Sequence, residues 1–167
     1  YPRYLRTDSE LAADGFSPIS AAERKLFDLF RKQLPEEFTV FHGVLLQSPR
    51  KGGGIFDREI DFLIAHPEHG LLVIEVKTEL VSIEETLRRL DVKVRLAAKV
   101  VEERFGWRPA GVGRLLVLPD GTTARSAVKR HDAVLRPAFP VRGPRLRTWL
   151  RAPAGSVGAL AFLPDTR

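Results

Sequence analysis

Two acidic residues and a lysine interrupt apolar stretches of the chain that would otherwise suit buried strands. Residues 71–77 read LLVIEVK and contain Glu75 and Lys77, and Asp61 lies within the preceding apolar run. Because alternate side chains of a strand point to the same face, Glu75 and Lys77 share one face. Carboxylate oxygens gathered on one face suit a hard cation such as Mg²⁺. The spacing therefore predicts a cation site beside a lysine.

A hairpin would bring these residues together. The HPEHG segment at 66–70 supplies turn residues between strands predicted over residues 56–65 and 71–78. With this turn at its centre, the hairpin sets Asp61 opposite Glu75, and opposed carboxylates destabilise a sheet unless a positive charge lies between them. One face of the hairpin would be wholly apolar, formed by Ile60, Phe62, Ile64, Leu72, Ile74 and Val76.

The other face of the hairpin would end in a mouth of carboxylates. The same register places Glu59 opposite Lys77, and five acidic side chains would surround that lysine: Asp57, Glu59, Asp61, Glu75 and Glu79. This donor set favours an oxygen-ligand site for Mg²⁺. The alternative is a solvated end of a sheet with a Glu59–Lys77 ion pair.

The sequence around this hairpin resembles the PD-(D/E)XK nuclease superfamily, in particular its nuclease-related-domain and Holliday-junction-resolvase-like branches. Asp61 is followed by thirteen residues and then by Glu75-Val76-Lys77, and Ile60 stands where the name-giving motif has proline. The resemblance covers roughly residues 20 to 120. It implies an α/β fold of the restriction-endonuclease-like type, with a central mixed sheet of four to five strands flanked by helices.

The resemblance also implies roles for individual residues. Asp61 and Glu75 would bind Mg²⁺, with Mn²⁺ as a substitute, the carbonyl of Val76 would complete part of the shell, and Lys77 would lie by the attacking water. Members often add a glutamate from the first helix, and Glu23 is the matching candidate, although a capping role explains it equally well. The implied activity is that of an endodeoxyribonuclease. The alternative is a catalytically silent module that binds nucleic acid or a protein partner.

The elements that position these residues follow from periodicity and from start and stop signals. Capping boxes at Ser20 and Ser82 begin two helices, and Pro35 and Gly106 end them. Helices are predicted over residues 20–34, 83 to about 105, 123–136 and 144–151, and strands over 38–46, 56–65, 71–78, 114–118 and 158–163.

The charge of the chain is uneven. Residues 1–80 carry 10 Lys and Arg against 13 Asp and Glu, whereas residues 81–167 carry 17 against 8. A basic half favours a polyanionic partner, with nucleic acid ahead of a membrane, and the resemblance implies DNA in particular. On the long predicted helix, Arg89, Lys93 and Arg95 lie off the apolar stripe, so we expect them to contact the phosphate backbone. A merely solvated helix face is the alternative.

Length and composition bound the remaining possibilities. The 167 residues suit one domain, over residues 20–167, after a lead-in at 1–19. The absence of Cys excludes thiolate nucleophiles and Cys-based zinc sites. No apolar run reaches the roughly 18 residues of a membrane span, so we expect a cytoplasmic protein that does not contact membranes. The sequence starts at Tyr1 without any Met, so we expect a trimmed N-terminus. A homodimer is one option for the oligomeric state.

Overall fold

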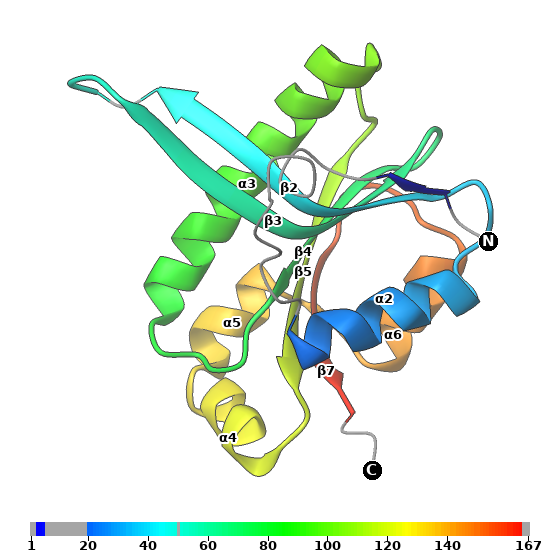
Figure 1. Ribbon diagram of the computed structural model, residues 1–167. Helices are drawn as coiled ribbons and strands as arrows, with labels where there is room; N and C mark the ends of the chain where they lie inside the picture. Colours follow the sequence, from blue (N-terminus) through cyan, green and yellow to red (C-terminus); the bar gives the residue numbers. More distant parts are fainter. Residues whose placement is uncertain (1–2, 6–19, 50, 165–167) are drawn as a thin grey trace.

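One mixed sheet organises the structure, a computed structural model that describes residues 3–5, 20–49 and 51–164. The strand order is β1-β2-β3-β4-β5-β7-β6 (Figure 1). The strands are β1 (Arg3–Leu5), β2 (Thr39–Pro49), β3 (Ile55–His66), β4 (Gly70–Val76), β5 (Val112–Pro119), β6 (Val141–Arg142) and β7 (Gly158–Leu163). The α/β class predicted from the sequence is confirmed.

The predicted count of four to five strands is wrong, because the sheet has seven within the described residues. The two additional strands, β1 and β6, are only three and two residues long, too short to show an alternating pattern. Strand β1 pairs in parallel with β2, so residues 3–5 of the predicted lead-in join the sheet.

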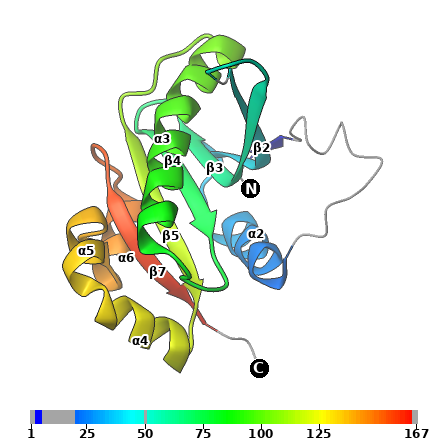
Figure 2. The same ribbon diagram turned by 90° about the vertical axis from the view of Figure 1, so that its left-hand side faces the viewer.

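Helices cover the two faces of the sheet (Figures 1 and 2). They are α2 (Ala21–Gln33), α3 (Ile83–Phe105), α4 (Thr122–Arg130), α5 (Asp132–Ala138) and α6 (Pro144–Arg151). One core cluster joins the sheet to α3, α4 and α5, and the other joins it to α2 and α6. The sequence placed the core on one face of the hairpin, whereas both faces are buried. None of the described helices is long and apolar enough to cross a membrane.

The predicted helix boundaries hold where capping signals define them. The hydroxyl oxygens of Ser20 and Ser82 accept N–H bonds three residues on, and α3 ends at Gly106 in the left-handed conformation, φ 71°. The helix predicted over residues 123–136 is instead two helices, α4 and α5, because the backbone leaves helical geometry at His131 (φ −105°, ψ 20°).

The predicted register of the β3–β4 hairpin is confirmed from Phe62 to His66, but the pairing ends before Asp61, which is not paired with Glu75 as the sequence predicted. Phe62 pairs with Ile74, Ile64 with Leu72, and His66 with Gly70. The turn ends at Gly70, whose φ is 98° and whose missing Cβ would lie 2.2 Å from the carbonyl oxygen of Gly111. A glycine here therefore meets two demands at once, a left-handed backbone and a close approach of two chain segments.

The predicted all-apolar hairpin face is wrong at Ile60. Phe62 packs in the cluster beneath α2, but Ile60 packs in the cluster beneath α3, although the two residues have the same parity along β3. The register of β2 with β3 skips Gly43 opposite Asp61, and Gly43 has a φ of 65°. The alternation of side chains along β3 is therefore broken at Asp61. Even-numbered residues face α3 before this point and α2 after it.

Replacing Gly70 should test the close approach that holds the hairpin against the neighbouring loop. Gly70→Ala should lower the free energy of unfolding by about 3 kcal/mol or more, because its methyl group meets backbone as well as a strained φ. Gly53→Ala is the matched control. Gly53 has a φ of 96° with nothing within 4 Å, so it should cost only about 1 kcal/mol. Urea unfolding of both variants measures the difference, and equal costs would contradict the contact.

Candidate active site

Strands β3 and β4 separate where the predicted site residues lie. Their pairing ends at Phe62 and Ile74, and beyond this pair the Asp61 Oδ2 accepts the backbone N–H of Val76 at 2.7 Å. Strand β4 remains paired with β5 up to Val76, and the next N–H, of Lys77, donates to the carbonyl of Val117 at 3.0 Å. Asp61 therefore serves a backbone donor at the point where the β3–β4 ladder has ended.

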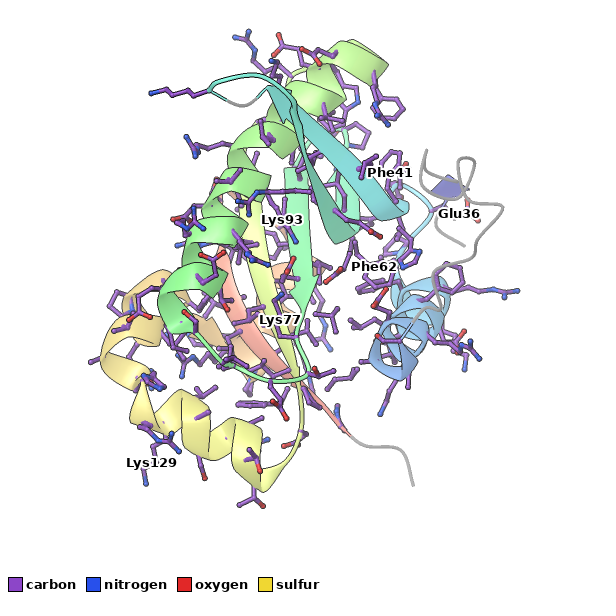
Figure 3. All side chains as sticks on the ribbon, turned by 60° about the vertical axis from the view of Figure 1, so that its left-hand side comes forward. Glu36, Phe41, Phe62, Lys77, Lys93 and Lys129 are labelled. Atoms are coloured by element: carbon purple, nitrogen blue, oxygen red, sulfur yellow. The ribbon has the colours of Figure 1, made fainter. Side chains whose placement is uncertain are left out.

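Glu75 is a buried carboxylate held by two lysines. Its residue exposure is 4%, its Oε1 lies 3.1 Å from the Nζ of Lys77, and its Oε2 contacts the Nζ of Lys93. Lys77 extends from the end of β4 and Lys93 from α3 (Figure 3). A carboxylate is tolerated in an interior when it is paired and hydrogen-bonded, and this arrangement provides both.

Two sequence-based expectations for these lysines are wrong. Lys93 was expected on an exposed face of the helix, but its side chain is only 8% exposed, because it lies on the same stripe as the buried Leu90 and Ala97. The predicted register placed Glu59 opposite Lys77, with an ion pair between them as the alternative to a cation site, but Lys77 contacts Glu75 while Glu59 is exposed. The sequence predicted several carboxylates around one lysine, whereas in the structure one carboxylate, that of Glu75, contacts two lysines.

Asp61 carries the electrostatic cost of the site. Burial raises its pKa from 3.8 to about 7, and the nearby charges of Glu75 and Glu23 add to the rise. The N–H of Val76 and the ammonium of Lys93 act in the opposite direction but do not cancel it. The ionised form of Asp61 is therefore disfavoured in the metal-free protein, and a further positive charge would relieve it.

Glu23 both caps α2 and faces the sheet. Its N–H donates to the hydroxyl of Ser20 at 3.1 Å, that hydroxyl donates to its Oε1 at 2.9 Å, and its Oε2 lies 3.0 Å from the Nε2 of His42. No motif in the sequence points to His42 as a site residue. What could have indicated His42 is its position next to Gly43 in β2, where it pairs with Phe62, the residue that follows Asp61 in β3.

The acidic mouth expected from the sequence is not assembled in the structure. Within the described residues, no group of three or more His, Asp or Glu side chains is placed to hold one metal ion. The side chain of Asp57 lies outside the described residues. The donors present are carboxylate oxygens of Asp61 and Glu75, hard ligands of the kind Mg²⁺ and Mn²⁺ prefer. These oxygens suit a cation, which would lower the cost of ionising Asp61. To reach the Oε1 of Glu75, the cation would have to displace the ammonium of Lys77.

Basic side chains of α3 lie on two different sides of the helix. Arg89 is one turn before Lys93 and on the same side, is about half exposed, and pairs with Glu85. Arg95 follows Lys93 by two residues, about 200° around the helix, and is exposed. Of the three residues expected to contact nucleic acid, the structure therefore places Arg89 near the site, Lys93 inside it and Arg95 away from it.

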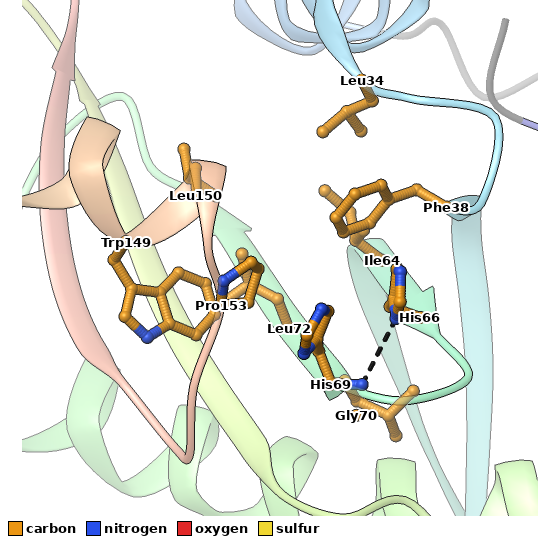
Figure 4. A pocket seen from close by; sticks show the side chains of 11 residues that line it. Leu34, Phe38, Ile64, His66, His69, Gly70, Leu72, Trp149, Leu150 and Pro153 are labelled. Atoms are coloured by element: carbon orange, nitrogen blue, oxygen red, sulfur yellow. Dashed lines mark hydrogen bonds between the residues drawn. The ribbon is translucent and has the colours of Figure 1, made fainter.

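A pocket lies at the other end of the hairpin. Figure 4 shows it between α6, the segment after α2 and the hairpin turn, with Phe38, His66 and Trp149 among its lining residues. Its volume is about 20 Å³, roughly one water molecule. The Nδ1 of His66 accepts the backbone N–H of His69 at 3.3 Å. On β4 the pocket is lined by Gly70, Leu71 and Leu72, which precede Glu75 by three to five residues, or roughly 10–16 Å at about 3.3 Å per residue, so it is no part of the carboxylate site.

Comparison with known proteins agrees with the hairpin motif. The family model of the nuclease-related domain matches residues 20–96, from the cap of α2 to the first half of α3. The resemblance to the PD-(D/E)XK nucleases is therefore confirmed over this part of the chain. The match indicates a nuclease-related domain in this part of the chain.

The other comparisons add little to this match. No curated protein matches the chain. Among solved structures, the chain is similar to a repair endonuclease from Pyrococcus abyssi, with 15% sequence identity and a TM-score of 0.30. The similarity covers 70% of this chain and 46% of that one, so the chain spans less than half of that endonuclease.

Asp61→Asn should stabilise the metal-free protein at neutral and alkaline pH. Since the folded-state pKa of Asp61, about 7, is above its ordinary value of 3.8, the native state binds the proton more tightly. The wild type therefore loses stability as the pH rises from about 4 to 7. The variant avoids this loss and can still accept the N–H of Val76. In EDTA at pH 8 its free energy of unfolding should exceed that of the wild type by on the order of 2 kcal/mol, with no gain near pH 4.

Asp120→Asn provides a control of opposite sign. The Arg125 guanidinium that bonds Asp120 lowers the pKa of this exposed carboxyl, so the wild-type ion pair stabilises the fold above pH 4 and the variant should lose that contribution. Urea unfolding at pH 4.5, 6 and 8 separates the two cases. A destabilised Asp61→Asn protein at pH 8 would contradict the cost assigned to Asp61.

Proposed function

We propose that the protein is a metal-dependent nuclease that hydrolyses phosphodiester bonds of nucleic acid, DNA in particular. The observation that carries the proposal is the position of Asp61, Glu75 and Lys77 at the separation of β3 from β4, within the segment that matches the nuclease-related domain. Asp61 and Glu75 would hold Mg²⁺, or Mn²⁺ in its place, with the carbonyl of Val76 and with Glu23 as a supporting acid.

The hydrolysis requires an activated water and a neutralised phosphate. A bound divalent ion lowers the pKa of water and withdraws charge from the phosphoryl oxygens. The protein's own groups supply the rest. Lys77 is at the mouth with a side chain 31% exposed, so its ammonium can reach a phosphate or the attacking water. In the free protein this ammonium pairs with the Oε1 of buried Glu75.

A phosphate track would begin beside the carboxylates. Ile60 packs beneath α3, so Arg58, two residues earlier on β3, projects from the same face. Burial and the nearby charges of Arg88 and Arg89 lower the pKa of Arg58. Positive charges gathered in this way favour a polyanion, and bidentate guanidinium groups suit phosphate oxygens.

A catalytically silent module that binds nucleic acid is the second candidate. Its support is that each oxygen of Glu75 already contacts a lysine. A carboxylate neutralised in this way can serve the fold without any metal. The two candidates differ in one requirement, since only the nuclease needs a divalent cation.

Loss of either central side chain should abolish cleavage. In assays with Mg²⁺ or Mn²⁺ on linear duplex, single-stranded and branched DNA and on RNA, Glu75→Gln and Lys77→Ala should each lower the turnover rate at least about 100-fold. Glu103→Gln and Lys129→Ala, exposed residues of α3 and α4, are matched controls and should retain the wild-type rate. Binding without cutting on every substrate would favour the silent module, and full turnover of Glu75→Gln would exclude its catalytic role.

Salt dependence should locate the nucleic-acid surface on α3. For duplex DNA, the slope of log affinity against log salt changes by about 0.9 per phosphate contact. Arg89→Ala should therefore flatten the slope by about that amount, because Arg89 lies on the side of α3 that faces the site. Arg95→Ala changes the same charge on the other side and should leave the slope unaltered. Fluorescence anisotropy between 50 and 300 mM salt measures both, and the reverse result would place the DNA on the far side of α3.

A further inference from the structure

Lys93 differs from Lys77 in how firmly it is held against Glu75. The side chain of Lys93 is 8% exposed, whereas that of Lys77 is 31% exposed. Lys93 extends from the middle of a 23-residue helix, flanked on its buried side by Leu90 and Ala97, each 0% exposed. Lys77 follows the last residue of β4, where the strand ends. Of the two ammonium groups, only that of Lys77 can turn toward solvent without moving a helix.

The two oxygens of Glu75 are therefore unequal. The Oε2 contacts the anchored ammonium of Lys93, and the Oε1 contacts the movable ammonium of Lys77 at 3.1 Å. A divalent ion that displaced Lys77 would reach the Oε1. An ion at the Oε2 would have to force the Lys93 ammonium into the apolar contacts that surround it, where an unpaired charge is strongly disfavoured.

We infer that Lys93 acts as a built-in cation that limits this centre to a single divalent ion. The inference rests on the proposed function, since it concerns the metal which that function requires. Lys93 is a positioning residue in this assignment. It fixes the carboxylate of Glu75 through the Oε2, supplies the positive charge that a second ion would bring, and leaves the Oε1 and Asp61 as the carboxylate ligands of one ion.

Charge arithmetic favours the same count. Asp61 and Glu75 bring two negative charges to the centre when both are ionised, and Lys77 and Lys93 bring two positive ones. One divalent ion makes the centre net positive, which suits an incoming phosphate. A second ion would add two more positive charges within a few ångströms of the first and of Lys93, and Glu23, a further carboxylate whose charge acts on Asp61, would offset only part of them.

Counting bound Mn²⁺ tests the inference without relying on activity. Isothermal titration calorimetry and the electron paramagnetic resonance signal of free Mn²⁺ give the number of ions per chain and their affinities. The wild type should bind one Mn²⁺ at this centre, and Lys93→Arg should also bind one. Lys93→Met, which removes the charge but keeps an unbranched side chain, should bind the first ion at least about tenfold more tightly and admit a second. Lys99→Met, an exposed change on the same helix, is the matched control and should behave as the wild type.

The outcomes separate the two proposals. Two ions bound by the wild type at this centre, or a Lys93→Met protein unchanged in both count and affinity, would overturn the role of Lys93 while leaving the nuclease proposal intact. No Mn²⁺ bound by the wild type or by any variant would overturn the nuclease proposal, and this inference with it. If Lys93→Met fails to fold, the wild-type and Lys93→Arg counts still decide the question.

Discussion

The hydrogen bond from the N–H of Val76 to the carboxylate of Asp61 is the contact on which the site depends. Strand β3 pairs with β4 only as far as Phe62 and Ile74, so the N–H of Val76 needs another acceptor where the ladder has ended. Asp61 supplies it, and this keeps the two strand ends close after their pairing has ceased. The carboxylates of Asp61 and Glu75 are thereby held near Lys93 of α3 and Glu23 of α2, two helices that cover opposite faces of the sheet.

The second constraint is that both faces of this sheet are core. Glu75 points into the cluster beneath α3, where an isolated carboxylate would be prohibitively costly. Lys93 makes that position tolerable, because it brings an ammonium to the carboxylate from a helix that is itself anchored by apolar neighbours. Helix α3 therefore has two tasks at adjacent turns, since Lys93 faces inward to Glu75 and Arg89 remains half exposed at the mouth.

Local signals in the sequence were sufficient for the helix caps, the hairpin turn and its register, since each depends on a few neighbouring residues such as Ser82 or Gly70. Features that depend on contacts between elements distant in the sequence could not be predicted in this way. The exchange of faces at Ile60 arises from Gly43 on the adjacent strand. The burial of Lys93 arises from its carboxylate partner 18 residues earlier, which periodicity alone cannot reveal. The contact of His42 with Glu23 likewise joins a strand to a helix.

The two carboxylates differ in what they still lack. Glu75 has an ammonium at each oxygen, and its burial is thereby compensated within the chain. Asp61 accepts one backbone N–H, but burial and the nearby charge of Glu75 raise its pKa to about 7, although this bond and the charge of Lys93 act in the opposite direction. The less well compensated carboxylate is therefore Asp61, where β3 and β4 separate, rather than the more deeply buried Glu75. In the proposed metal site a cation would gain most by binding there, so Asp61 would provide the larger part of the electrostatic drive for binding and Glu75 would provide the fixed geometry.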